Sequence, residues 1–256
     1  MPSSLESILP HVPAFVLVLF RLSGIFLFAP LFGSNLIPMR VKVLLALVLS
    51  FCVYPLIPPQ IPLELSLMTI AGAITSELLI GLLIGYGASL PLIALQLAGM
   101  LMGQQLGLGL ARIFNPDLDD ETEVLGQFFY LVALTIFLLL DGHHILLATL
   151  IRSFDHVPLG GYMADLAVLQ VLTGLLTSML ELGIRVAAPL LTLVFLETVA
   201  MGFVARTVPQ LNILSLGFPL RIILGFFMCI GLVAVMHDEF AASLRHALTA
   251  MMRVFG

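Results

Sequence analysis

Charged side chains are scarce in this 256-residue chain. Asp, Glu, Lys and Arg together make up 10% of it, against about 25% in a typical soluble domain. Hydrophobic residues make up 61%. A soluble fold of this length would have too few polar residues to cover so much apolar surface. Lipid or other apolar protein must therefore replace water around much of the chain.

Other absences exclude whole classes of function. The chain has only ten Lys and Arg residues and a net charge of -5. No basic patch is evident in it, which argues against a nucleic-acid partner. The two cysteines, Cys52 and Cys229, lie inside apolar runs and have no spacing typical of zinc sites or disulfide frameworks. No P-loop pattern is present. Residues 1–11 contain no Lys or Arg, so we expect no cleavable signal there and expect the first apolar run to remain as a helix.

Apolar segments separated by short polar breaks fill most of the chain. Long Leu, Ile and Ala stretches of about 20 residues, without alternation, predict membrane-type helices. The predicted segments are 13–32, 41–57, 67 to about 102, 128–151, two between 166 and 205, and 211–236. Pro91 is the expected kink or break of the third segment, and the prolines within helical stretches, Pro30, Pro91, Pro189 and Pro219, free backbone carbonyls that need protein neighbours. The predicted fold class is all-α, with polytopic membrane-type helical hairpins.

Several charges lie inside these apolar segments, where a simple membrane span would carry none. They are Arg21, Glu77, Glu181, Arg185, Glu197 and Arg221. A charge at the centre of a bilayer costs about 2.5–3.5 kcal/mol or more. We therefore expect these helices to pack against other protein, where the charges find partners. Two G-x-x-x-G pairs, Gly81 with Gly85 and Gly99 with Gly103, likewise favour close helix packing.

A glycine-rich stretch followed by an acidic one, residues 99–123, interrupts the apolar pattern. It is either an ordinary loop between spans or a mobile gate, in which glycines give flexibility and apolar side chains form a stopper. The residues of the candidate gate are Gly103, Gly107, Gly109, Ile113, Phe114, Asn115, Pro116 and Asp117.

Asp141 precedes the adjacent pair His143 and His144. A metal or catalytic site here would need further ligands, for which residues 237–239 are candidates. Neighbouring residues of a regular helix point about 100° apart, so both histidines cannot face one ion. We therefore expect a helix end or a packed polar pair here, with Asp141 and Gly142 as a turn, and no catalytic, metal or cofactor site in the chain.

Five local motifs, in this order, carry a resemblance to a known family. The chain resembles the FliR family of flagellar export proteins and its SctT-type relatives in virulence type III secretion. The motifs are Arg21 with FLFAPLFGSNLIPMRVK, Glu77 with LLIGLLIGYG, AGMLMGQQLGLGLARIFNPDLDD, FLLLDGHHILLATLIRSFDHVPLG, and ETVAMGFVARTVPQLNILSLGFPLRIILG. Each motif alone is weak, but together they cover nearly the whole chain.

The resemblance implies a non-enzymatic component of a type III export gate in the bacterial inner membrane, at the flagellar basal body. Its implied partners are FliP-like and FliQ-like subunits in a spiral complex, with FlhB-like and FlhA-like proteins, lipid, and unfolded substrate proteins passing through a conduit. It implies one domain, FliP-like over about 1–160 and FliQ-like over about 161–256, and it favours the gate interpretation of the glycine-rich loop. Intersubunit polar contacts are expected at Arg21, Glu77, Arg185, Glu197, Arg206, Gln210, Asn212 and Arg221.

Two other functions stay open from the residues alone. A secondary solute transporter would use the intramembrane charges as a proton relay, and it predicts an internal repeat that is not evident here. An intramembrane enzyme would use Asp141, His143 and His237.

Overall fold

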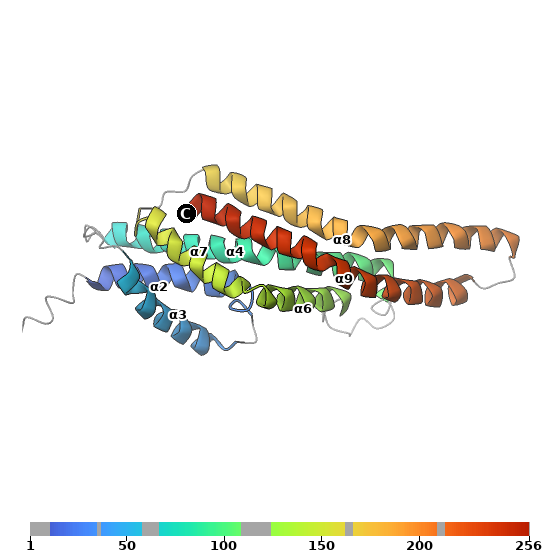
Figure 1. The fold of residues 1–256 in the computed structure, drawn as a ribbon, viewed down its shortest axis with the longest axis horizontal. Coiled ribbons are helices and arrows are strands. Elements are labelled where there is room, and N and C mark those ends of the chain that lie inside the picture. The colour runs from blue at the N-terminus through green and yellow to red at the C-terminus, as the bar shows by residue number, and fades with distance from the viewer. Residues whose placement is uncertain are drawn as a thin grey trace, which may run out of the picture. The chain divides into compact units, whose positions relative to one another are not determined.

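The computed structural model describes residues 11–34, 37–57, 67–108, 124–161, 166–208 and 213–255, and within these ranges there is no β-strand (Figure 1). The elements are α2 (His11–Phe28), α3 (Met39–Val53), the short 3-10 helix η1 (Tyr54–Leu56), α4 (Leu67–Gln105), α6 (Val124–Leu139), α7 (Gly142–His156), α8 (Leu166–Thr207) and α9 (Ile213–Phe255). In this part of the chain, five helices are long and apolar enough to cross a membrane, or six if α6 and α7 form one broken span. The predicted all-helical membrane fold class is confirmed.

Helix boundaries differ from the prediction in several places. The two segments expected between residues 166 and 205 form the single helix α8, with Pro189 inside it, and α9 continues well past the expected end at 236. Proline is tolerated within membrane helices because neighbouring groups satisfy the freed backbone carbonyls. The segment expected at 128–151 is divided at the predicted turn of Asp141 and Gly142, because Asp141 adopts a left-handed backbone conformation with φ 54°. Pro30 follows the end of α2 and does not kink it.

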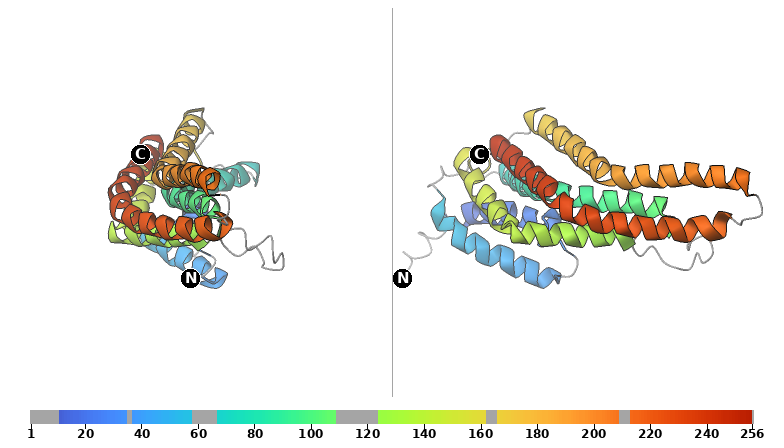
Figure 2. Two further views of the ribbon diagram at one scale, coloured as in Figure 1. Left: turned by 90° about the vertical axis from the view of Figure 1, so that its right-hand side faces the viewer. Right: turned by 45° about the vertical axis from the view of Figure 1, so that its right-hand side comes forward.

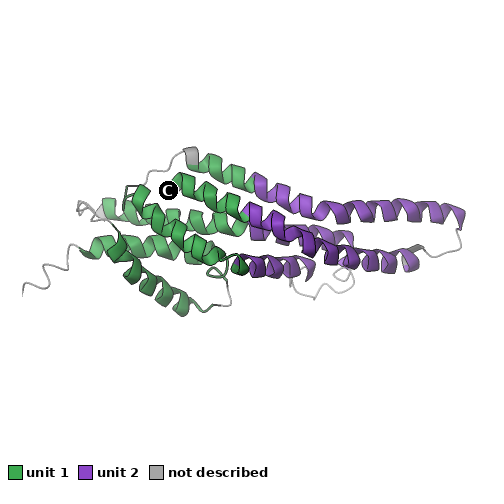
Figure 3. Cartoon of the chain, in the orientation of Figure 1, with its two compact units in different colours: residues 1–90, 138–176, 244–256 green, residues 91–137, 177–243 purple. Residues whose placement is uncertain are grey.

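The chain divides into two compact units, and each is described by itself (Figure 3). Unit 1 comprises residues 1–90, 138–176 and 244–256, and unit 2 comprises residues 91–137 and 177–243. The helices α4, α8 and α9 each contribute residues to both units. This division does not follow the predicted boundary near residue 160, so the comparison of the two halves with FliP-like and FliQ-like folds stays a prediction.

Glycines bring α2 and α4 into direct backbone contact within unit 1. A Cβ atom added at Gly24 would lie 2.5 Å from the carbonyl oxygen of Leu78, and one added at Gly81 would overlap the carbonyl oxygen of Arg21. Gly85, the second member of that predicted pair, would place a Cβ 3.2 Å from the amide nitrogen of Ala29. Both members of the Gly81–Gly85 pair therefore lie at a helix contact, as the spacing predicts.

The second predicted glycine pair behaves less uniformly in unit 2. A Cβ at Gly99 would lie 2.8 Å from the Cα of Gly126 in α6, so α4 and α6 also approach backbone to backbone. A Cβ at Gly103 would meet only the side chain of Leu125, at an ordinary 3.7 Å. Only the first member of this pair requires glycine for packing.

The helices differ widely in how much of their apolar surface the chain itself covers. In the apolar window of α4, 67% of the residues are buried, whereas the share is 28% in α8, 17% in the span formed by α3 and η1, and 11% in α9. The long helices α8 and α9 are distinguished in Figure 2 by their orange and red colours. Phe195 and Phe203 in α8 and Phe227 in α9 are 66%, 69% and 71% exposed.

Candidate functional site

A charged pair lies at the centre of unit 1. Arg21 in α2 and Glu77 in α4 are both 0% exposed, and the guanidinium Nε donates to the Glu77 carboxylate at 2.5 Å. The glycine contact between α2 and α4 brings the two side chains together, because Gly24 and Gly81 lie one turn beyond them on the facing helices.

The remaining polar atoms of this pair are satisfied by α7 and the turn after it. Arg21 donates to the backbone oxygens of Ser153 and Val157, both at 3.0 Å, and to the Ser153 hydroxyl at 3.1 Å. The second carboxylate oxygen of Glu77 accepts from the backbone N–H of Gly160 at 2.8 Å. Desolvating two charges is costly, and attraction between them compensates only where such additional hydrogen bonds exist. The result is a closed cluster that joins α2, α4 and α7, hereafter the Arg21 cluster.

Two features of the 153–160 segment shape the Arg21 cluster. The Phe154 ring lies with its centroid 4.1 Å from the Arg21 guanidinium carbon, a cation–π contact. Gly160 has φ 72°, a backbone conformation that glycine adopts without strain, and this turn aims its N–H at Glu77. Sequence reasoning missed the role of these residues. They occur in the quoted motif RSFDHVPLG, but the predicted helical segment ended at residue 151, whereas α7 continues to His156.

The Arg21 cluster corrects the expectation that Arg21 and Glu77 contact other subunits. Both side chains are fully enclosed by their own chain and have all their charged atoms directed at internal partners. They have no surface left to offer another protein. Arg21 and Glu77 are structural residues of unit 1.

A second pair joins α8 and α9 in unit 2. Arg221 donates from Nε and Nη2 to the same Glu197 oxygen, at 3.0 and 2.8 Å, and from Nη2 to the Thr198 hydroxyl at 2.8 Å. The Glu197 side chain is 5% exposed, but that of Arg221 is 29% exposed. This pair, hereafter the Arg221 cluster, therefore presents part of its guanidinium at the surface, among the exposed apolar side chains of α9.

The other predicted polar contacts lie at the surface or outside the described residues. Arg185 bonds Glu181 at 2.6 Å and Glu239 at 3.3 Å, and all three side chains are about half exposed or more, at 57%, 64% and 48%. Arg206 is exposed, and it has no ion pair within the described parts of the chain. Gln210 and Asn212 fall outside the described residues.

Only two of the predicted gate residues are described. Gly103 belongs to α4 and not to a loop. Gly107 follows the end of that helix with φ 77°, and its N–H donates to the carbonyl of Gln104 at 3.0 Å. A glycine with positive φ just after a helix is a common way to end it. Gly109, Ile113, Phe114, Asn115, Pro116 and Asp117 fall outside the described residues, so the gate stays a prediction.

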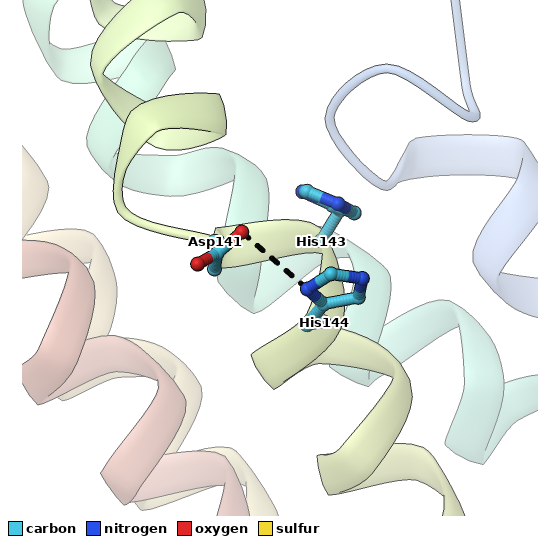
Figure 4. Close-up of side chains that lie close together, drawn as sticks. All are labelled: Asp141, His143 and His144. Carbon is cyan, nitrogen blue, oxygen red and sulfur yellow. Dashed lines mark ion pairs between the residues drawn. The ribbon is translucent and has the colours of Figure 1, made fainter.

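The side chains of Asp141, His143 and His144 come together where α7 begins (Figure 4). The His144 Nδ1 atom lies 3.4 Å from the Asp141 carboxylate, and the two imidazole centroids lie 4.1 Å apart. A helix end or a packed polar pair was expected here, and α7 does begin at Gly142. The two histidines were also expected to point too far apart to face one ion, but their side chains converge. His237 and Asp238, 3.3 Å apart, belong to unit 2 and are not members of this group.

Comparison with known proteins identifies the family of this chain. The family described as "Bacterial export proteins, family 1" matches residues 12–247. This chain belongs to that family. The family match includes every residue of the Arg21 and Arg221 clusters.

Named relatives of this bacterial export protein cover most of its length. It is 31% identical over 236 residues to the flagellar biosynthetic protein FliR of Bacillus subtilis, covering 90% of each chain. It is 29% identical to the FliR protein of Escherichia coli, over 84% of this chain and 82% of the relative. It is 30% identical to the Yop proteins translocation protein T of Yersinia pestis, over 68% and 67% of the two chains.

These relatives and the apolar helices place this family member in a type III secretion export apparatus, as a membrane-embedded component of a multi-protein system. The FliR-family resemblance read from the five motifs is confirmed.

Proposed function

We propose that this chain assembles with FliP-like and FliQ-like subunits into the export gate of a flagellar secretion apparatus in the bacterial inner membrane. There it forms part of the conduit through which unfolded proteins pass. FlhB-like and FlhA-like proteins are its further partners. The chain does no catalysis in this role, so other components supply the energy.

One observation carries the proposal beyond family membership: the C-terminal helices are apolar yet largely uncovered by their own chain. Only 11% of the apolar window of α9 and 28% of that of α8 are buried, although α9 has a mean hydropathy of 2.3 in that window. Bilayer lipid alone would cover an uncharged helix of this kind. The half-exposed charges of Arg185 and Glu239, and the partly exposed guanidinium of Arg221, favour protein neighbours instead.

Co-isolation tests the assembly. The tagged full chain is expressed in a bacterium lacking its own copy of the gene, and the membrane complex is extracted in mild detergent. We expect FliP-like and FliQ-like subunits to be isolated with it in fixed ratio, and flagellar secretion to be restored. A chain that is isolated as a stable monomer, and that transports a small solute when reconstituted alone, would establish the transporter alternative.

The gate stays part of the proposal, on residues 107–117. Deleting a segment of this stretch is expected to leave co-isolation unchanged while altering secretion or raising ion leakage across the membrane. A matched control replaces the same number of residues by alternating Gly and Ser, which keeps the length and removes the apolar stopper. Normal secretion and normal leakage in both variants would mean that the stretch is an ordinary loop.

A further inference from the structure

The Asp141, His143 and His144 group combines three potential metal ligands at one end of α7. Each residue offers one ligand atom, and no two of these atoms lie more than 4.8 Å apart. Around a tetrahedral ion with ligand distances of about 2.0–2.1 Å, ligand atoms lie roughly 3.3 Å from one another. The spacing of 3.4 Å between His144 and Asp141 already fits this value. Because the side chains of Asp141 and His144 are each 71% exposed, small rotations can close the remaining distances.

Two further observations indicate that Asp141 and His143 do not make the hydrogen bonds that usually satisfy such side chains at the start of a helix. Asp141 holds the N-cap position of α7, where an Asp carboxylate usually accepts from the helix N–H groups, yet it makes no such bond and faces His144 instead. The Nδ1 atom of His143 is buried and has no hydrogen-bond partner within the described residues. A carboxylate released from capping and an imidazole nitrogen without a donor are the two ligand types that a divalent transition metal takes.

The electrostatics of the helix end are compatible with a cation only because of Asp141. The N-terminus of α7 carries the positive end of the helix dipole, which disfavours a bound cation. The negative charge of the Asp141 carboxylate, 3.4 Å from the His144 Nδ1 atom, offsets it. Two imidazoles and one carboxylate suit a borderline first-row ion, such as Zn²⁺, over Ca²⁺ or Mg²⁺, which prefer all-oxygen sites.

We propose that Asp141, His143 and His144 bind one Zn²⁺-like divalent ion per chain, with water or a group of another molecule as the fourth ligand. The ion connects the left-handed residue before α7 to the first turn of that helix and so stabilises the start of α7. This proposal is independent of the role in export, because it concerns only residues of unit 1.

Metal titration of the full chain, isolated with the subunits that accompany it, tests the proposal. The protein is purified through a tag without histidine and treated with chelator, and Co²⁺ is added while its visible absorption is recorded, followed by Zn²⁺ as competitor. We expect one equivalent of saturable absorption per copy of this chain that Zn²⁺ displaces. The variants Asp141→Asn and His144→Gln should each weaken the apparent affinity at least tenfold, and Zn²⁺ should raise the unfolding midpoint of the parent protein but not of the variants.

The control is His246→Gln, because His246 is exposed in the same unit but lies outside the group. It should bind like the parent. Asn tolerates the left-handed conformation at position 141, so Asp141→Asn removes the ligand charge while keeping the backbone. The proposal is overturned if no saturable Co²⁺ absorption is seen, if the two variants bind like the parent, or if His246→Gln weakens binding as much as they do.

Discussion

The Arg21 cluster and the Arg221 cluster both join an arginine to a glutamate across two apolar helices, but they differ in burial and in how many of their polar atoms have partners. In the Arg21 cluster both side chains are 0% exposed, and Ser153, Val157 and Gly160 satisfy the remaining polar atoms. In the Arg221 cluster the arginine is 29% exposed and has only Glu197 and Thr198 as partners. In the Arg21 cluster every charged atom has a hydrogen-bond partner within the chain, whereas the Arg221 guanidinium has donor capacity left for another molecule.

The packing around the two clusters differs in the same direction. Gly24 and Gly81 allow backbone contact beside the Arg21 cluster, and α4 is the most completely covered of the long helices. At Gly217, beside the Arg221 cluster, an added Cβ would meet the Met201 side chain at 3.3 Å and the Glu197 carboxylate at 3.5 Å, with no backbone in reach. The Arg21 pair is therefore enclosed within one subunit, whereas the partly exposed guanidinium of Arg221 is the one that we propose contacts another subunit.

The largest effect is expected from breaking the Arg21 cluster. Glu77→Ala leaves the Arg21 guanidinium buried without its counter-charge, which typically costs about 3–5 kcal/mol. We expect loss of the folded chain from the membrane, measured as its steady-state level and as the unfolding midpoint in detergent. The double variant Arg21→Met with Glu77→Leu removes both charges and should recover much of the level. If Glu77→Ala accumulates like the parent, the cluster does not hold unit 1 together.

A somewhat smaller effect is expected at the glycine contact. In Gly81→Ala the new methyl group would overlap the Arg21 carbonyl, so α2 and α4 must separate, and overpacking of this kind costs typically about 1–3 kcal/mol. The matched control is Gly72→Ala in the same helix, where a Cβ meets nothing within 4 Å. Thermal unfolding of the two variants should differ clearly, with Gly72→Ala equal to the parent or slightly more stable because alanine favours helix. Equal midpoints would mean that α2 and α4 are not in backbone contact.

The Arg221 cluster should show its effect on assembly more than on folding. Arg221→Met keeps the apolar stem but leaves Glu197, which is 5% exposed, without its cationic partner. We expect an intermediate fall in stability, of about 1–3 kcal/mol, and a larger proportional fall in the amount of partner subunits isolated with the chain. Quantifying both in one preparation separates the effects. A variant that folds less well but binds its partners in the normal ratio would place this cluster, like the first, wholly inside the subunit.

The smallest effect is expected at Arg185. Its bonds to Glu181 and Glu239 join side chains that are all about half exposed, and exposed pairs contribute about 0–1 kcal/mol. Arg185→Gln should therefore leave the unfolding midpoint of the isolated chain nearly unchanged. A fall in the unfolding midpoint as large as that caused by Glu77→Ala would show that the exposure of an ion pair does not predict its contribution to stability.

Sequence reasoning reached the helical fold class because long apolar runs leave the backbone few other options in a membrane. It also predicted that the charged residues find protein partners, and for Arg21 and Glu77 these partners lie within the same chain. It could not pair Arg21 with Glu77, which is 56 positions away, or with Ser153, 132 positions away, because no local pattern records which helices touch. The assignment of these residues to intersubunit contacts failed for that reason.

Local backbone geometry accounts for the other differences. Two segments were expected between residues 166 and 205, but α8 continues through Pro189 as one helix, which membrane helices tolerate. The predicted turn at Asp141 and Gly142 did form, with a left-handed residue before α7, and the side chains of His143 and His144 converge although adjacent residues of a helix point apart. The predicted gate residues 109–117 lie outside the described residues, so the site expected there is carried by the family resemblance alone.

The central claim is that partner subunits cover the exposed faces of α8 and α9. Photo-crosslinking in living cells tests it most directly, with benzoylphenylalanine in place of Phe227, which is 71% exposed, or of Phe240, which lies in the same helix and is 0% exposed. We predict that position 227 forms covalent products with other gate subunits, identifiable by mass spectrometry, and that position 240 forms none. Products with lipid alone at position 227, in cells where the apparatus is assembled and secreting, would contradict the claim.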